Sequence, residues 1–374
     1  MTAVVDRRLV VQTWLGTRLL LLVVACLVMV VDQRTPADCL ANWDVQHFFA
    51  IAERGYTEDS LTAFFPGWPL MLRGLAALGV PLLVGGCALA AVGSALAAAA
   101  LYRLGGPGAA IVWLLAPTAV FTLVPYTESV FCAAAFWAWE RASARHWGQA
   151  AALAAVAASV RVSGLFLVGA LLILALTQRG DGQAPMPWRS KLAHAAWLLL
   201  PAGVLFAYAA FLHLRTGSWL AWYQAQSSGW VRGFTWPWDS FWHTLDPMTP
   251  GAYPEHPEWS WVFRAEMLSM AVGVVVTVAC LVRRRLAEAS WVGVQVLAFS
   301  LSYWFFSVNR AVLLWFPLWT WLGGALNQRP GGGGSARPGA GGRAKGGLAV
   351  AAAAVALAVQ ALWAWLFYTG RWAS

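Results

Sequence analysis

Long apolar segments alternate with short polar ones along the whole chain. A helix of about 20 apolar residues crosses the ~30 Å hydrocarbon core of a bilayer. Segments near this length occur at 14–31, 81–103, 108–124, 127–140, 192–213, 262–282, 288–308, 311–326 and 348–368. A further segment, 148–177, is too long for one upright span and carries the polar stretch Arg161–Gly164. We interpret it as two short helices that reverse direction there, so the pattern predicts about eleven transmembrane helices.

Composition supports this interpretation. Of the 374 residues, 60% are hydrophobic and 11% charged, and the mean hydropathy is +0.62. Soluble domains do not reach these values. The first apolar segment lacks a small-residue cleavage site, so we interpret it as an uncleaved span and not as a signal peptide. The sequence therefore predicts an all-α polytopic membrane protein that forms a single domain over residues 1–374.

The distribution of charge predicts the orientation in the membrane. The net charge is +9, but the basic residues fall in small groups between apolar segments, which is typical of cytoplasmic loops and not of a nucleic-acid surface. Placing Arg7 and Arg8 inside puts the acid-rich loop 32–67 outside, together with the long loop 215–262. The Gly-rich stretch 329–345 then becomes a cytoplasmic linker. The prevalence of arginine, alanine and glycine is typical of a GC-rich bacterial genome, so we expect a bacterial cell membrane.

The first outer loop contains the densest group of candidate site residues. Its stretch "NWDVQHFFAIAERGY" predicts a short interfacial helix with Asn42 as N-cap, in which Asp44 and His47 lie one turn apart. Asp44 is either a functional carboxylate or a first-turn acid favoured by the helix dipole. The following "AFFPGWP" predicts a stiff bend that shapes a groove for lipid or sugar. The aromatic and proline residues expected at this groove are Trp43, Phe64, Phe65, Pro66, Trp68 and, from a later segment, Tyr126.

Three further charged residues lie at or near the ends of apolar segments. Glu128, in "VPYTESVF", is either a capping acid or a second cavity carboxylate. Arg161 lies between two apolar half-helices and needs a partner, which is either Glu128 or an anionic ligand. Arg310 either snorkels to the interface or binds a phosphate. The tryptophans of the loop 215–262 suit sugar rings and lipid headgroups equally.

Several of these segments together resemble the PIG-V mannosyltransferases and their bacterial relatives. The matching stretches are "WDVQHFFAIAERGY", "AFFPGWPLMLR", "PYTESVF", "RVSGL" and, more loosely, "NRAVLLWFPLW", in which Ala311 replaces a common aromatic residue. The resemblance implies a GT-C glycosyltransferase with an essential acid in its first outer loop. It also implies a polyprenyl-phosphate-mannose donor, inversion at the anomeric carbon and an α-mannoside product.

An inverting transfer needs a base on one side of the sugar and stabilisation of the leaving phosphate on the other. We expect Asp44 to be the base, Arg161 and Arg310 to bind the phosphate, and His47 and Glu128 to orient the reacting groups. No metal or other cofactor is expected, because neither the acidic residues nor the five cysteines show a ligand spacing that demands one. The acceptor is an unknown glycan, glycolipid or protein on the extracytoplasmic side.

Other functions remain open on sequence alone. A transferase of another sugar, such as glucose or arabinose, would share these residues. A transporter of lipids or sugar-lipids would also carry a broken helix and an intramembrane arginine, although a paired second break is missing. A third alternative is an inert subunit that binds a lipid-linked sugar for another enzyme.

Overall fold

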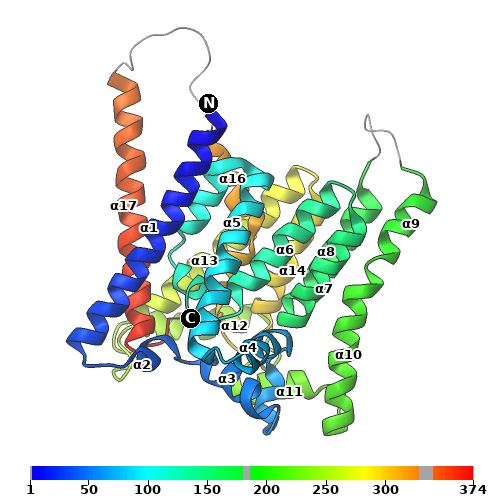
Figure 1. The fold of residues 1–374 in the computed structure, drawn as a ribbon, viewed down its shortest axis with the longest axis horizontal. Helices are drawn as coiled ribbons and strands as arrows, with labels where there is room; N and C mark the ends of the chain where they lie inside the picture. Colours follow the sequence, from blue (N-terminus) through cyan, green and yellow to red (C-terminus); the bar gives the residue numbers. More distant parts are fainter. Residues whose placement is uncertain (1, 180–185, 328–339, 374) are drawn as a thin grey trace.

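The computed structural model describes residues 2–179, 186–327 and 340–373, and within these ranges the regular secondary structure is helical (Figure 1). The helices of the first half are α1 (Thr2–Val31), α2 (Pro36–Leu40), α3 (Asp44–Arg54), η1 (Asp59–Ala63), α4 (Gly67–Ala77), α5 (Leu82–Leu114), η2 (Ala119–Thr122), α6 (Glu128–Ser143), α7 (Trp147–Val160) and α8 (Ser163–Thr177). The second half contains α9 (Trp188–Ala196), α10 (Leu199–Thr216), α11 (Ala221–Trp230), α12 (Pro237–Met248), α13 (Trp259–Val282), α14 (Leu286–Ser300), α15 (Val308–Ala311), η4 (Val312–Leu314), α16 (Phe316–Asn327) and α17 (Ala340–Tyr368).

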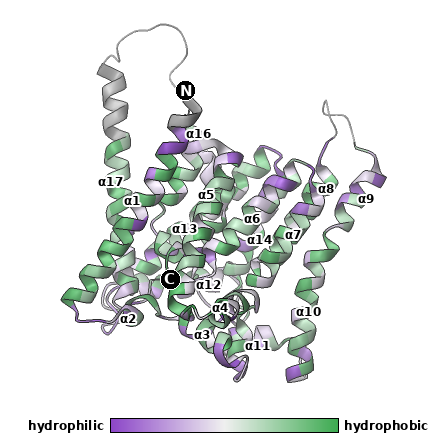
Figure 2. Ribbon diagram, viewed as in Figure 1, coloured by the Kyte–Doolittle hydropathy of each residue, from purple (hydrophilic) through white to green (hydrophobic). Residues whose placement is uncertain are grey.

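Five helical segments are long and apolar enough to cross a membrane. They are Asp6–Val31, Leu82–Leu114, Trp188–Thr216, Trp259–Val282 and Ala349–Tyr368. Figure 2 shows apolar residues along the lengths of these helices and polar residues gathered toward their ends. The fold is thus that of a polytopic all-α membrane protein, as expected. The full number of crossings stays a prediction, since α7, α8 and α14 are apolar but shorter.

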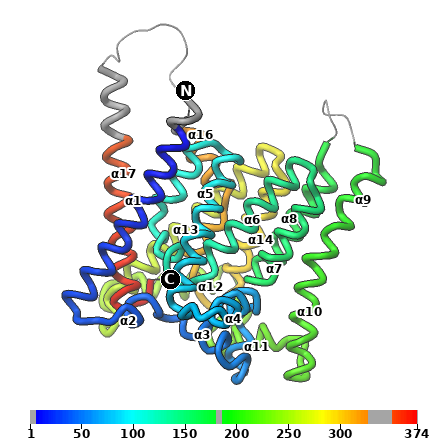
Figure 3. Tube along the Cα trace, viewed as in Figure 1, coloured from blue at the N-terminus to red at the C-terminus, as the bar shows by residue number. Residues whose placement is uncertain are grey.

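The centre of the bundle is α6, which packs against both α5 and α7. Most of its residues are buried, and small side chains let its neighbours approach closely. At Gly93 of α5, an added Cβ would lie 2.9 Å from the backbone of Ser129. Helices α1 and α17, the first and the last in the chain, also run side by side (Figure 3). Small residues therefore set the tight spacing that holds the start of α6 in place.

The helices differ from the expected segments in three places. The span expected at 288–308 ends at Ser300, and farther along the chain the backbone N–H of Ser307 donates a hydrogen bond to the buried carboxylate of Glu266. The loop expected at 215–262 contains the helices α11 and α12. Of the expected linker 329–345, residues 329–339 lie outside the described part, and the rest belongs to α17. Extending an existing helix backward costs much less than nucleating one, so an apolar helix can continue into Gly-rich sequence.

The segment 148–177 divides as predicted. Helix α7 ends at Val160 and α8 begins at Ser163, with Arg161 in an extended conformation between them. The reversal requires Gly164, since a Cβ there would lie 2.3 Å from the Cα of Ala158. This close approach fixes the position of the turn that contains Arg161.

Candidate active site

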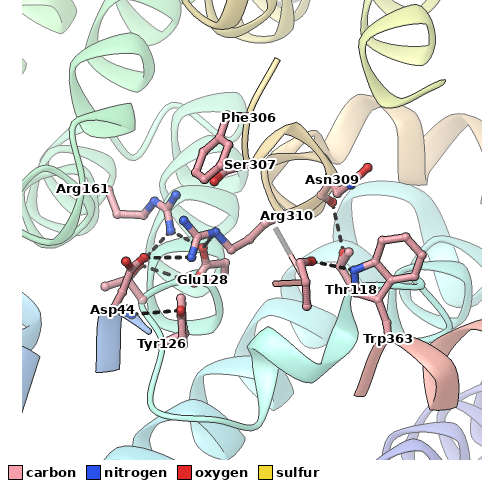
Figure 4. Close-up of polar contacts among 12 residues, drawn as sticks. Asp44, Thr118, Tyr126, Glu128, Arg161, Phe306, Ser307, Asn309, Arg310 and Trp363 are labelled. Atoms are coloured by element: carbon pink, nitrogen blue, oxygen red, sulfur yellow. Dashed lines mark hydrogen bonds and ion pairs between the residues drawn. The ribbon is translucent and has the colours of Figure 1, made fainter. Parts of the chain in front are cut away.

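Asp44 and Arg310 form an ion pair between distant parts of the chain. The Nη1 atom of Arg310 donates to Oδ2 of Asp44 at 3.0 Å. The side chain of Asp44 is 17% exposed and that of Arg310 is 10% exposed. The backbone N–H of Asp44 also donates to the hydroxyl of Tyr126 at 3.2 Å, which anchors the start of α3. In Figure 4, Asp44, Tyr126, Glu128, Arg161 and Arg310 point toward one another.

Glu128 links the second arginine to the first. Its side chain is fully buried and forms ion pairs with Arg161 Nη1 and, at 3.1 Å, with Arg310 Nε. Arg161 also donates to Oγ1 of Thr127 at 2.7 Å. The interpretation of Glu128 as a simple capping acid is therefore insufficient, and Glu128 is the partner that Arg161 needs. Burying such charges is costly unless they are paired and hydrogen-bonded, so the four charged groups depend on one another.

The local fold that presents Asp44 differs from the expected cap. Trp43, not Asn42, occupies the N-cap position of α3, with a left-handed φ of 56° and no capping side-chain hydrogen bond. The amide of Asn42 instead donates to the carbonyls of Cys39 and Phe367. Asn42 was predicted to cap because its side chain suits that role locally, but a long-range contact with α17 takes its donor.

Arg310 is positioned by a buried carboxylate that was not among the predicted site residues. Glu266, in α13, accepts hydrogen bonds from the backbone N–H groups of Ser307 and Asn309 at 3.0 and 2.9 Å. Ser307 has a left-handed φ of 64°, so these bonds hold a locally strained backbone. The signal was present in the sequence, because Glu266 is an acidic residue inside an apolar segment, where ionisable groups are rare and functional.

Side chains also satisfy the backbone of the bend after α3. The carbonyl of Phe64 accepts hydrogen bonds from the hydroxyls of Tyr56 and Tyr208, both at 2.8 Å. The carbonyl of Ala63 accepts one from Trp222 Nε1 at 3.1 Å. Burial raises the pKa of Tyr56, so its phenol keeps the proton that it donates. Irregular backbone in an apolar region needs such partners, and the bend is thereby fixed.

A cavity of about 570 Å³ opens beside the charged groups. Asp44, Arg161 and Arg310 lie in its wall, together with the side chain of Arg232. An apolar section of the wall comes from α8, with Leu165 and Phe166. No described residue donates a hydrogen bond to Oδ1 of Asp44, so this oxygen is available to a substrate. The arrangement combines a carboxylate acceptor, several N–H donors and an apolar surface.

The predicted groove residues divide into two groups. Phe64 and Phe65 line the cavity. Tyr126 is buried beneath the ion pairs, with Arg310 over its ring at 5.0 Å. Trp43 is exposed and Trp68 is buried with its indole N–H on the carbonyl of Pro125, so neither they nor Pro66 line the cavity.

His47 occupies a different environment from the one expected. Its ring stacks on Phe64 at 5.1 Å and meets the edge of Trp230 at 5.8 Å. Among the described residues it forms no hydrogen bond with Asp44 or Glu128. Within residues 2–179, 186–327 and 340–373, no group of three or more His, Cys, Asp or Glu side chains is arranged to hold a metal ion.

The N-terminal part of the chain matches a known family. Residues 19–180 match the family model described as Mannosyltransferase (PIG-V). GPI alpha-1,6-mannosyltransferase 2 of Rattus norvegicus is 36% identical over 152 residues, and that of Homo sapiens is 35% identical over 152 residues. Each match covers 36% of this chain and 31% of the relative. The chain therefore matches about a third of the length of these curated relatives.

No solved structure matches the chain. The matched region contains Asp44, Tyr126, Glu128 and Arg161, whereas Arg310 lies beyond it. Thus the family match and the ion-pair geometry select the same loop and the same helix start. Over residues 19–180, this chain is similar to the PIG-V mannosyltransferases.

Proposed function

We propose that this protein transfers mannose from polyprenyl-phosphate-mannose to an acceptor hydroxyl on the extracytoplasmic side of a bacterial cell membrane. Transfer inverts the anomeric carbon and forms an α-mannoside. The observation that carries the proposal is the convergence of Asp44, Glu128, Arg161 and Arg310 beside a cavity with an apolar wall. Similarity to proteins named as GPI alpha-1,6-mannosyltransferase 2 supports mannose as the sugar.

Asp44 is the general base in this proposal. Its Oδ2 is held by Arg310, and its Oδ1 accepts the proton of the acceptor hydroxyl as that oxygen attacks the anomeric carbon. The bond between the anomeric carbon and the phosphate oxygen breaks at the same time. The electron pair leaves with the polyprenyl phosphate, and no metal or other cofactor takes part.

Arg161 and Arg310 stabilise the departing phosphate. A guanidinium carries five N–H donors, so each arginine can keep its carboxylate partner and still donate to a phosphate oxygen. Glu128 holds the two guanidiniums in place. His47, stacked on Phe64, contributes to the aromatic surface beside the sugar.

The lipid chain lies along the apolar wall of the cavity. Leu165 is 53% exposed although it belongs to α8, which packs inside the bundle on its other side. Leu165 and Phe166 stand four and five positions after Arg161, so a phosphate at Arg161 would lead directly to this surface. A full bundle of about eleven crossings, with α3 at the lipid–water interface, completes the proposed architecture.

Membranes from cells that lack the gene provide the test, since they contain the unprocessed acceptor. The purified chain is added with synthetic polyprenyl-phosphate-mannose, and mannosylated products are identified by mass spectrometry. Donors with glucose or arabinose determine the sugar. Donor movement across proteoliposomes without any transfer would favour a transporter instead, and transfer that needs a second protein would indicate a supporting subunit.

A further inference from the structure

Arg232 is a third arginine in the wall of the same cavity, and no described carboxylate forms an ion pair with it. Among the described residues, no carboxylate lies within ion-pair distance of its guanidinium. Its Nη2 makes one long hydrogen bond, 3.5 Å, to the carbonyl of Phe306. Its Nε is shielded from solvent and has no hydrogen-bond partner among the residues that the structure describes. This differs from Arg161 and Arg310, whose charges are each met by a carboxylate.

The surroundings of Arg232 disfavour an isolated cation. Its guanidinium lies 5.9 Å from the ring centres of both Phe299 and Phe306. Burial lowers the pKa of Arg232 to about 10, and the positive charge of Arg310 acts in the same direction, while the charges of Asp44 and Glu266, beyond ion-pair distance, act against it. A buried guanidinium without a carboxylate at ion-pair distance is costly, and an anion in the cavity would reduce that cost.

The backbone directly before Arg232 is strained. Val231, the residue directly before it, ends α11 with a left-handed φ of 53°. A β-branched residue is a clear outlier in this conformation, and such outliers gather at ligand sites. Arg232 directly follows this turn, and its side chain lies in the cavity wall.

We propose that Arg232 binds the phosphate of the lipid-linked sugar, together with Arg161 and Arg310. This rests on the proposed function for the identity of the lipid. Asp44 and Glu128 already neutralise Arg161 and Arg310 in part, so Arg232 supplies the charge that selects an anion. The apolar wall at Leu165 and Phe166 then favours a prenyl phosphate over free phosphate.

Binding of farnesyl phosphate to the purified full chain tests the assignment, measured as a Kd by native mass spectrometry. Farnesol lacks the charge and inorganic phosphate lacks the chain. We expect R232Q to weaken farnesyl phosphate binding roughly 10- to 100-fold, the loss typical of a charged hydrogen bond. The control R215Q removes an exposed arginine at the end of α10 and should leave the Kd unchanged. If R232Q does not fold, R232M replaces it, because an unbranched apolar side chain suits the contacts with Phe299 and Phe306.

Wild-type affinity in a folded R232Q or R232M protein would overturn the assignment, as would equal binding of inorganic phosphate and farnesyl phosphate. Mannose transfer by the wild-type chain is measured in parallel. Transfer with an Arg232-independent Kd overturns the role of Arg232 alone. Absence of transfer with an Arg232-dependent Kd overturns the proposed function and leaves a prenyl-phosphate site.

Discussion

Arg310 Nη1 lies 3.0 Å from Asp44 Oδ2, although the two residues stand 266 positions apart. Asp44 begins α3 in the first loop, and Arg310 lies in the short helix α15. The region that matches the PIG-V family ends at residue 180. The matched region alone therefore lacks one of the two arginines that hold the acidic groups.

The pairing of Glu128 with two arginines predicts a large effect on stability. E128Q leaves Arg161 without its carboxylate and removes one of the two from Arg310, and breaking a buried pair in this way typically costs about 3–5 kcal/mol. We expect a lower melting temperature in detergent. E288Q is the control, because Glu288 forms a surface pair with Arg285, and such pairs contribute about 0–1 kcal/mol.

A double variant separates the contribution of the Glu128–Arg161 ion pair to stability from the other effects of removing Glu128. E128Q/R161Q removes both partners, so no uncompensated charge is left at Arg161. The two single-variant effects should therefore add to more than the effect of the double variant, with a coupling of roughly 0.5–3 kcal/mol. Simple additivity of the unfolding free energies would mean that the pair does not contribute.

The reversal between α7 and α8 predicts a site where one methyl group is not tolerated. In G164A the added Cβ would meet Ala158 Cα at 2.3 Å, so the turn that presents Arg161 must open. We expect destabilisation of about 1–3 kcal/mol, the usual cost of overpacking, and reduced mannose transfer. G169A lies in the same helix with no atom near its Cβ position, and it should retain wild-type stability and transfer. Equal melting temperatures for both variants would contradict the turn geometry.

Glu266 is predicted to position Arg310 through the backbone. A glutamine at this site has one acceptor oxygen in place of two, so Ser307 or Asn309 would lose a hydrogen bond, at a cost of about 1–3 kcal/mol. We expect E266Q to lower the kcat of transfer more than it raises the KM for the donor, because the loop that carries Arg310 loses its fixed position. E255Q, in the exposed loop before α13, is the matched control. A kcat unchanged in E266Q would show that the loop is held by other contacts.

Local patterns predicted much of the fold and part of the site. The helix break at Arg161 followed from the length of an apolar segment. The cost of an isolated charge predicted a partner for Arg161, with Glu128 as one of two candidates. Asp44, Glu128 and Arg310 stood out because charges are rare in this chain. Each of these inferences rested on residues close in sequence or on the general free-energy cost of a charge in an apolar segment.

The remaining features depend on long-range contacts that no local pattern encodes. Asn42 suits an N-cap, but its amide is taken by Phe367 on α17. Arg232 belongs to a tryptophan-rich loop, and only the folded chain brings it to the cavity of Arg161. Glu266 was the exception, since its position in an apolar segment was a readable signal.

The central claim is that Asp44 accepts the proton of the acceptor hydroxyl. Its most direct test is the initial rate of mannose transfer from polyprenyl-phosphate-mannose by purified D44N, with farnesyl phosphate binding measured on the same sample. D59N is the control, because Asp59 is an exposed acid of the same loop. The proposed mechanism predicts a fall of about 10²–10⁴-fold for D44N, the usual contribution of a general base, with binding retained within a few-fold and D59N unchanged. Transfer by D44N at the wild-type rate would contradict it.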